Sequence, residues 1–254
     1  MHRVALEFRP GGGWVALREL RGCDEDSVEE TNTEAAIALL DRLLCEVPGA
    51  AVQPGDAAEL TTPDRDRLLA DVYRRNIADR IESTLICSAC KAPLDVDFTL
   101  SALVASLDRG LARPDEGVYS LADGRAFRLP TGVDELASAS ATPERAPSVL
   151  ARACVVKGNP EDDPDALAAA MQEAGPLLDI DLDATCTECH AVQSLHFDLQ
   201  HYMLSQLVAD RFVRALEVHR LARAYGWGLH EIQNLPRAQR RMYVELVDRE
   251  LAGR

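Results

Sequence analysis

The sequence predicts an α+β fold in which two β-hairpins, each with a Cys-x-x-Cys turn, are surrounded by helices. The motif occurs at Cys87–Cys90 and again, 99 positions later, at Cys186–Cys189. Apolar and polar residues alternate on both sides of each motif, as they do in half-buried strands. Elsewhere, apolar residues recur at three- and four-residue spacing, which is typical of amphipathic helices. The two motifs are therefore expected at the tips of two hairpins.

The two hairpins have similar sequences and suggest an internal repeat. The first is flanked by Ile81–Ile86 and Leu94–Leu100, and the second by Leu178–Asp183 and Val192–Leu199. At the same offset from the motifs, the matching pairs are Ala92 and Ala191, Val96 and Leu195, Phe98 and Phe197, and Leu100 and Leu199. We therefore expect each hairpin to supply half of one metal site.

Four cysteines in this arrangement are a typical ligand set for structural zinc. Two thiolates separated by two residues can bind one tetrahedral Zn²⁺ from a tight turn, and a second such turn completes the coordination. A shell of four sulfurs leaves no open position for water or substrate, so the predicted site is structural. Structural zinc contributes roughly 10–16 kcal/mol to folding. The predicted ligands of one Zn²⁺ are Cys87, Cys90, Cys186 and Cys189.

Four other interpretations of these cysteines compete with zinc. Cys186–His190 matches the C-x-x-C-H signature of covalent haem, which requires export, but no signal peptide is expected and Lys91 replaces the histidine in the first motif. A thioredoxin-like redox motif would begin a helix, whereas these motifs lie between predicted strands. Disulfides are uncommon in the expected cytoplasmic setting. Unpaired buried cysteines would not explain two matched pairs.

Composition indicates a soluble globular protein whose partners are proteins. The chain has 254 residues, of which 47% are hydrophobic and 27% charged, with a formal net charge of −15. That charge argues against broad nucleic-acid binding, and no apolar run is long enough to cross a membrane. We expect folding in the cytoplasm, with Cys23, Cys45 and Cys154 as small core residues. The expected regions are 1–60 with strands and a helix, 61–199 with the zinc site, and the helical segment 200–254.

The first region is predicted to contain two strands and then helices. Val4–Phe8 and Trp14–Leu20 are the expected strands, and the Gly-rich turn between them lacks the Lys of a phosphate loop. Asp24–Asp26 is expected to be a solvated acidic loop, without the spacing of a calcium loop. Thr33 is the expected N-cap of a helix through Leu44. Thr62-Pro63-Asp64 begins a helix predicted to run to about Arg80.

The segment between the motifs is predicted to hold a third hairpin and short helices. Its strands are Val118–Leu121 and Ala126–Leu129, joined by an Asp-Gly turn. Helices are expected at Val133–Ala137, from Ser148 onward, and at Pro164–Ala174.

The C-terminal segment is predicted to be helical. The longest pattern runs from Gln200 to about Tyr225, with a core-facing stripe at Leu204, Leu207, Val208, Phe212, Leu216 and Leu221. No second ligand lies at helical spacing from His201 or His219, so neither these nor His196 is expected to bind metal. The last two helices can imitate a helix-turn-helix reader of DNA.

Three stretches resemble one known family. Leu17–Asp26 is similar to an "LRELTGxDE" opening, and Asp64–Cys90 to a "DRDxLLxxLxRxxxGDRIExxxxCxxC" segment. The ending His219–Val247 is similar to "VHxLAxxYGWxExEILxLPxxRRxxYLELV". Together they resemble the zinc-knuckle proteins encoded beside contractile phage tails and phage-tail-like injection systems, similar to the base plate protein family of T-even phages. The departures are Cys23 and Gly228-Leu229-His230, outside the predicted metal site.

The resemblance implies a structural or assembly protein of a contractile injection apparatus, associated with its baseplate or hub. It implies other baseplate or hub proteins as partners and assembly in the cytoplasm. It does not decide whether the protein stays in the finished particle. It supplies no catalytic residues, and we expect neither an enzyme nor a small-molecule substrate. The alternative is a zinc-ribbon regulator that binds nucleic acid through its terminal helices. The residues expected to contact a partner are Tyr225, Trp227, Arg240, Arg241 and Tyr243.

Overall fold

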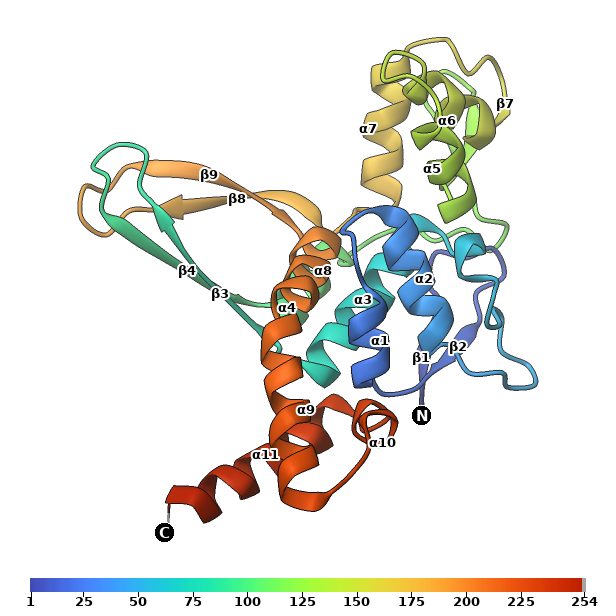
Figure 1. Ribbon diagram of the computed structural model, residues 1–254. Helices are drawn as coiled ribbons and strands as arrows, with labels where there is room; N and C mark the ends of the chain where they lie inside the picture. Colours follow the sequence, from blue (N-terminus) through green and yellow to red (C-terminus); the bar gives the residue numbers. More distant parts are fainter. Residues whose placement is uncertain (253–254) are drawn as a thin grey trace.

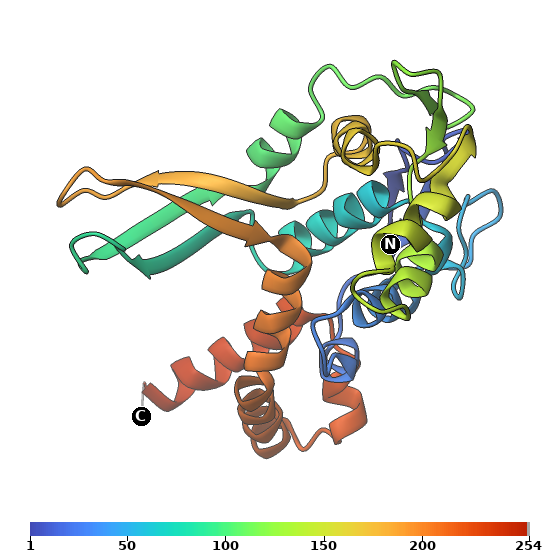
Figure 2. The same ribbon diagram turned by 90° about the horizontal axis from the view of Figure 1, so that it is seen from above.

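Helix α3 (Thr62–Asn76) lies in the middle of the molecule, and the computed structural model describes residues 1–252 around it. The α+β class is confirmed, because the described chain combines helices with antiparallel sheets of two or three strands. Figures 1 and 2 show a mostly helical body from which two long hairpins project together as an arm. Among the described residues, no helix is long and apolar enough to span a membrane.

The remaining elements follow in chain order. The strands are β1 (His2–Ala5), β2 (Trp14–Leu17), β3 (Arg80–Ile86), β4 (Pro93–Thr99), β5 (Val118–Ser120), β6 (Ala126–Arg128), β7 (Val155–Lys157), β8 (Asp179–Thr185) and β9 (Val192–Asp198). The other helices are α1 (Gly22–Ser27), α2 (Thr33–Leu43), the 3₁₀ turn η1 (Ala57–Glu59), α4 (Leu100–Leu107), α5 (Gly132–Ala139), α6 (Ala146–Cys154), α7 (Pro164–Ala174), α8 (Leu199–Ala209), α9 (Arg211–Tyr225), α10 (Leu229–Gln233) and α11 (Arg237–Ala252).

The main hydrophobic core is formed by β2, α2, α3 and α8. Leu17, Leu40, Leu69 and Leu204, one from each of these elements, are completely buried in it. The base of the arm joins the same core, because Ile81 and Phe197 pack into it. The arm is therefore anchored to the body by hydrophobic contacts.

Helix α3 ends earlier than the sequence predicts, and this positions the first hairpin. Thr61 caps the helix by accepting a hydrogen bond from the Asp64 amide, and Pro63 lies in the first turn. The chain leaves helical geometry at Ile77, and β3 begins at Arg80 instead of the helix continuing to that residue. Asp79, in the connection, accepts hydrogen bonds from the Ser101 backbone and hydroxyl, which ties the two ends of the hairpin together.

A smaller unit surrounds the sheet β5–β6–β7. The predicted hairpin is present, and β7 pairs with β6 as a third strand that the sequence pattern did not indicate. Phe127, Leu129 and Leu167 form its own apolar cluster beneath α6 and α7. This unit lies between the two long hairpins in the chain but away from the arm in space (Figure 1).

The predicted helix from Gln200 to Tyr225 is two helices, α8 and α9, that meet at Asp210. As a result, Phe212 is 79% exposed and Leu216 is 39% exposed, and the prediction that they face the core is wrong. The two helices bury different faces: α8 packs on the main core, whereas Leu221 of α9 packs in a third cluster with Ile232 and Val244. The break lets the C-terminal helices form a separate unit.

Candidate metal centre

The four predicted ligands meet at the far end of the arm. Strands β3 and β4 pair antiparallel from Arg80–Thr99 to Ile86–Pro93, and β8 and β9 from Asp179–Asp198 to Thr185–Val192. Each Cys-x-x-Cys segment lies in the turn that joins its two strands. Cys90 and Cys186 are 96 residues apart in sequence, and the packing of one hairpin on the other brings the two turns together.

The two turns have the same backbone geometry. In the first, the Cys87 amide donates to the Ala92 carbonyl at 2.9 Å, and the Lys91 amide donates to the Cys87 carbonyl at 3.0 Å. In the second, Cys186 and His190 make the equivalent bonds, to Ala191 and to Cys186, both at 2.9 Å. Lys91 and His190 have φ values of +63° and +60°, in the left-handed region that residues other than glycine rarely adopt. Both turns thus aim their cysteines into the same small volume.

The sulfur atoms are spaced as a tetrahedral metal site requires. All four Sγ atoms lie within 4.8 Å of one another. The Cys87–Cys189 and Cys90–Cys186 distances, which join the two hairpins, are both 3.7 Å. A tetrahedron with Zn–S bonds of about 2.3 Å places its sulfurs roughly 3.8 Å apart. The four cysteines can therefore hold one metal ion.

Backbone amides favour the thiolate form that a metal needs. The pKa of Cys87 is lowered to about 6, mainly because the Cys90 and Ala89 amides donate hydrogen bonds to its sulfur. The Ala92 amide acts in the same direction on Cys90, but the sulfur of Cys189 and the other thiols raise the pKa of Cys90 to about 12. Negative charges this close repel one another, so ionising all four thiols requires a cation among them.

This geometry argues against the four other interpretations of the cysteines. A separation of 3.7 Å between sulfurs is far longer than the bond of a disulfide, and all seven cysteines are free. A redox motif would begin a helix, whereas each motif here joins two strands. Scattered buried cysteines would not converge on one point. Covalent haem on Cys186 and Cys189 would take two sulfurs out of a complete set of four.

Hydrophobic contacts hold the two hairpins face to face behind the cysteines. Phe98 and Phe197 meet edge to face, with ring centroids 5.1 Å apart. At the tip, the Gln193 side chain accepts hydrogen bonds from the Ser88 amide and hydroxyl. Alternate residues point outward to solvent, among them Glu82, Asp95, Asp97, Asp179, Asp181 and Asp183. The arm has a thin apolar interior and acidic outer faces.

The aromatic residues predicted to contact a partner cluster beside the C-terminal helices. Tyr225 and Trp227 stack with centroids 4.7 Å apart, and the Tyr243 ring lies edge-on to both. Trp227 and Tyr243 pack against the third apolar cluster, and Tyr225 is 40% exposed. These side chains cover the core of the C-terminal unit, and Tyr225 offers the most exposed surface of the three.

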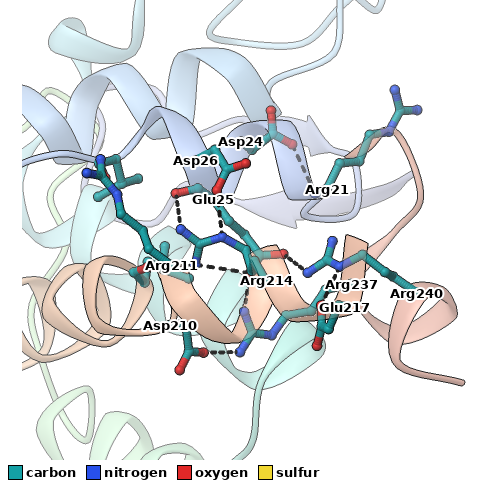
Figure 3. A network of polar contacts seen from close by, with 12 residues as sticks. Arg21, Asp24, Glu25, Asp26, Asp210, Arg211, Arg214, Glu217, Arg237 and Arg240 are labelled. Atoms are coloured by element: carbon teal, nitrogen blue, oxygen red, sulfur yellow. Dashed lines mark hydrogen bonds and ion pairs between the residues drawn. The ribbon is translucent and has the colours of Figure 1, made fainter. Parts of the chain in front are cut away.

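Arg240 does not lie on the surface, which corrects its assignment as a partner residue. It is 1% exposed and forms ion pairs with Glu25 at 2.7 Å and Glu217 at 2.6 Å (Figure 3). The carboxylates of Glu25 and Glu217 raise the pKa of Arg240, outweighing the opposite effect of burial. The neighbouring Arg241 has a side chain that is 45% exposed, with its nearest carboxylate oxygens 3.7 Å away.

The predicted acidic loop is also different in the structure. Asp24 and Glu25 belong to helix α1 and are completely buried. Glu25 pairs with Arg237 and Arg240, while Arg214 binds Asp26 at 2.8 Å (Figure 3). Sequence reasoning missed the pairs with α1 because Arg214, Arg237 and Arg240 lie 188, 212 and 215 positions from their partners and follow no local pattern.

Comparisons with protein-family models, with curated proteins and with solved structures found no match for this chain. The geometry of the cysteine cluster and the shape of the arm are therefore the basis for a functional conclusion.

Proposed function

We propose that the four cysteines bind one Zn²⁺ and that the two hairpins are halves of an internal repeat that shares it. The observation that carries this proposal is the convergence of four Sγ atoms within 4.8 Å of one another at the tip of the arm. The matched hydrogen bonds and positive φ values of the two turns support a repeat. A set of four thiolates suits zinc better than metals that prefer oxygen ligands.

Zinc in this site has a structural role. Four sulfurs complete a tetrahedral shell, which leaves no position for a substrate. The interior of the arm is thin, with residues such as Leu85 and Leu182 only partly buried. Two hairpins of this size gain little stability from so small an interior. The metal would hold together the ends that lie farthest from the main core.

A zinc-stabilised arm on a helical body suits a protein that functions by contact. On this proposal the chain is a structural or assembly protein of a contractile tail-like injection apparatus, associated with its baseplate or hub. The resemblance of Leu17–Asp26, Asp64–Cys90 and His219–Val247 to that family supports the context. The partners would be other proteins of the same apparatus, met during assembly in the cytoplasm.

The nucleic-acid alternative has less support. Arg240, in the terminal helices that would bind nucleic acid, is buried in ion pairs with Glu25 and Glu217. The outer faces of the arm carry carboxylates, and the formal net charge of the chain is −15. Binding to phosphate groups requires the opposite sign of charge.

Co-purification tests the proposed context. A tagged copy of the chain, expressed together with the proteins of a contractile apparatus from the same source, is expected to enrich baseplate or hub components. The matched control is the Cys87→Ser variant, which loses a proposed ligand and should recover less of them. Absence of the chain from both assembled particles and assembly intermediates would contradict the proposal.

A further inference from the structure

The arm has strand edges that pair with no further strand of the described chain. Each hairpin is a separate two-stranded sheet, so β3, β4, β8 and β9 each have one unpaired edge. Unpaired edges of this length, seven residues each, are templates for a further strand. Natural proteins usually cover or interrupt such edges, so their persistence here needs an explanation.

The pairing of β8 with β9 shows which backbone groups point outward. The Leu199 amide donates to Leu178, and the Cys186 amide donates to Ala191, at the two ends of this hairpin. Hydrogen-bonded pairs alternate in an antiparallel ladder, so every second residue between these ends has its N–H and C=O directed to the open edge. In β8 those residues are Asp179, Asp181, Asp183 and Thr185, and the first three carry carboxylates.

Of the four edges, that of β8 has the charge that best complements a strand with basic side chains. Strand β4 begins with Pro93, which lacks an N–H group, and Arg80 already pairs with Glu82 and Asp97 on the outer face of the first hairpin. Strand β9 has a mixed outer face. Strand β8 places three carboxylates at successive outward positions, and the imidazole of His196 on β9 lies 3.1 Å from Asp179 and 3.3 Å from Asp181.

We propose that the edge of β8 binds an extended segment of a partner protein as an added strand, with Lys or Arg at alternate positions. Cross-strand neighbours on one face of a sheet lie within reach of each other, so successive basic side chains would meet Asp179, Asp181 and Asp183. The same carboxylates disfavour pairing with the β8 edge of a second copy. The inference rests on the proposed function, because the metal holds the arm in shape.

A synthetic peptide tests the inference directly. The probe is a fluorescently labelled seven-residue peptide of alternating lysine and valine, added to the metal-loaded full-length protein while anisotropy is measured. We expect binding that weakens as salt is raised. A peptide with N-methyl groups on its strand-pairing amides keeps the charge but cannot donate hydrogen bonds, and it should bind at least tenfold more weakly.

Two proline variants separate strand addition from simple charge attraction. Asp181→Pro removes an N–H that faces the open edge without breaking a bond to β9, so the arm should stay folded. The matched control is Glu82→Pro, at the equivalent outward position of β3. Peptide affinity should fall at least tenfold in Asp181→Pro beyond the loss in Asp181→Asn, and should be unchanged in Glu82→Pro.

The outcomes are distinct. No binding by the metal-loaded protein at low salt overturns the inference, as does equal binding of the N-methylated peptide or equal loss in the two proline variants. Zinc content is measured on the same samples. Protein without zinc contradicts the proposed function, whereas protein that holds zinc and ignores the peptide contradicts this inference alone.

Discussion

At the residue scale, Asp66 connects the central helix to the second hairpin. Its carboxylate accepts a hydrogen bond from the Leu178 amide at 2.8 Å, one residue before β8. Burial raises the pKa of Asp66 to about 6, although Arg65 acts in the opposite direction. A buried carboxylate with a raised pKa is destabilising once it ionises, so this connection costs stability at neutral pH.

Asp66→Asn should remove that cost while keeping an oxygen that can accept the Leu178 amide. The folded state binds the Asp66 proton more tightly than the unfolded chain does, so the contribution of Asp66 to stability falls as pH rises from about 4 to about 6. The variant lacks this titration. Its free energy of unfolding, relative to that of the wild type, should therefore increase between pH 4 and pH 6, by up to about 3 kcal/mol above pH 6. Denaturant unfolding of both proteins at pH 4, 5, 6 and 7 measures this difference. A difference in free energy of unfolding that stays constant over these pH values would contradict the prediction.

The second Cys-x-x-Cys turn gives another single-residue prediction. His190 has a φ of +60°, which is unfavourable for a side chain but allowed for glycine. His190→Gly should raise the free energy of unfolding of the metal-loaded protein by about 1 kcal/mol. Thr187→Gly, in the same turn but without a positive φ, is the matched control and should lower it. Urea denaturation measures both, and a loss of stability in His190→Gly would show that the turn is not strained there.

At the scale of elements, the hairpins follow from local sequence, while the C-terminal helices depend on distant contacts. Period-two alternation places Leu94 inside and Asp95 outside, so the register of β3 and β4 can be inferred from the sequence. The break between α8 and α9 has no comparable local signal, since Phe212 and Leu216 continue the helical spacing of α8. Only the packing of α9 on α10 and α11 shows why the chain turns at Asp210.

The ion network attaches the C-terminal unit to α1, and it gives a prediction for two adjacent arginines. Arg240→Met leaves Glu25 and Glu217 buried with one partner fewer, which should cost about 3–5 kcal/mol. Arg241→Met removes a half-exposed side chain and should cost less than about 1 kcal/mol. Chemical denaturation compares the two variants. If the two substitutions lower the free energy of unfolding equally, Arg240 is not held in a buried ion pair as described.

At the scale of the whole molecule, sequence reasoning was most successful where chemistry is local. Cys87, Cys90, Cys186 and Cys189 could be chosen by spacing and hairpin context alone, and the structure brings them together. The mistaken assignment of a solvated loop at Asp24–Asp26 concerns acidic residues that tertiary contacts bury. Asp24 pairs with Arg18 and Arg42, and Glu25 pairs with arginines more than 200 positions away. A pattern of charge does not show whether a distant arginine will cover it.

The whole-molecule account depends on one metal joining two hairpins. Metal analysis of the purified protein by mass spectrometry tests this most directly, with Cys87→Ser and Cys154→Ser measured alongside it. Cys154 is buried at the end of α6 and is not one of the four clustered cysteines, and burial raises the pKa of its thiol to about 12. It is therefore a matched control that should not affect metal binding. We predict one zinc per chain in the wild type and in Cys154→Ser, and a sharp loss of zinc and stability in Cys87→Ser. No zinc, or two zinc ions per chain in the wild type, would contradict the shared site.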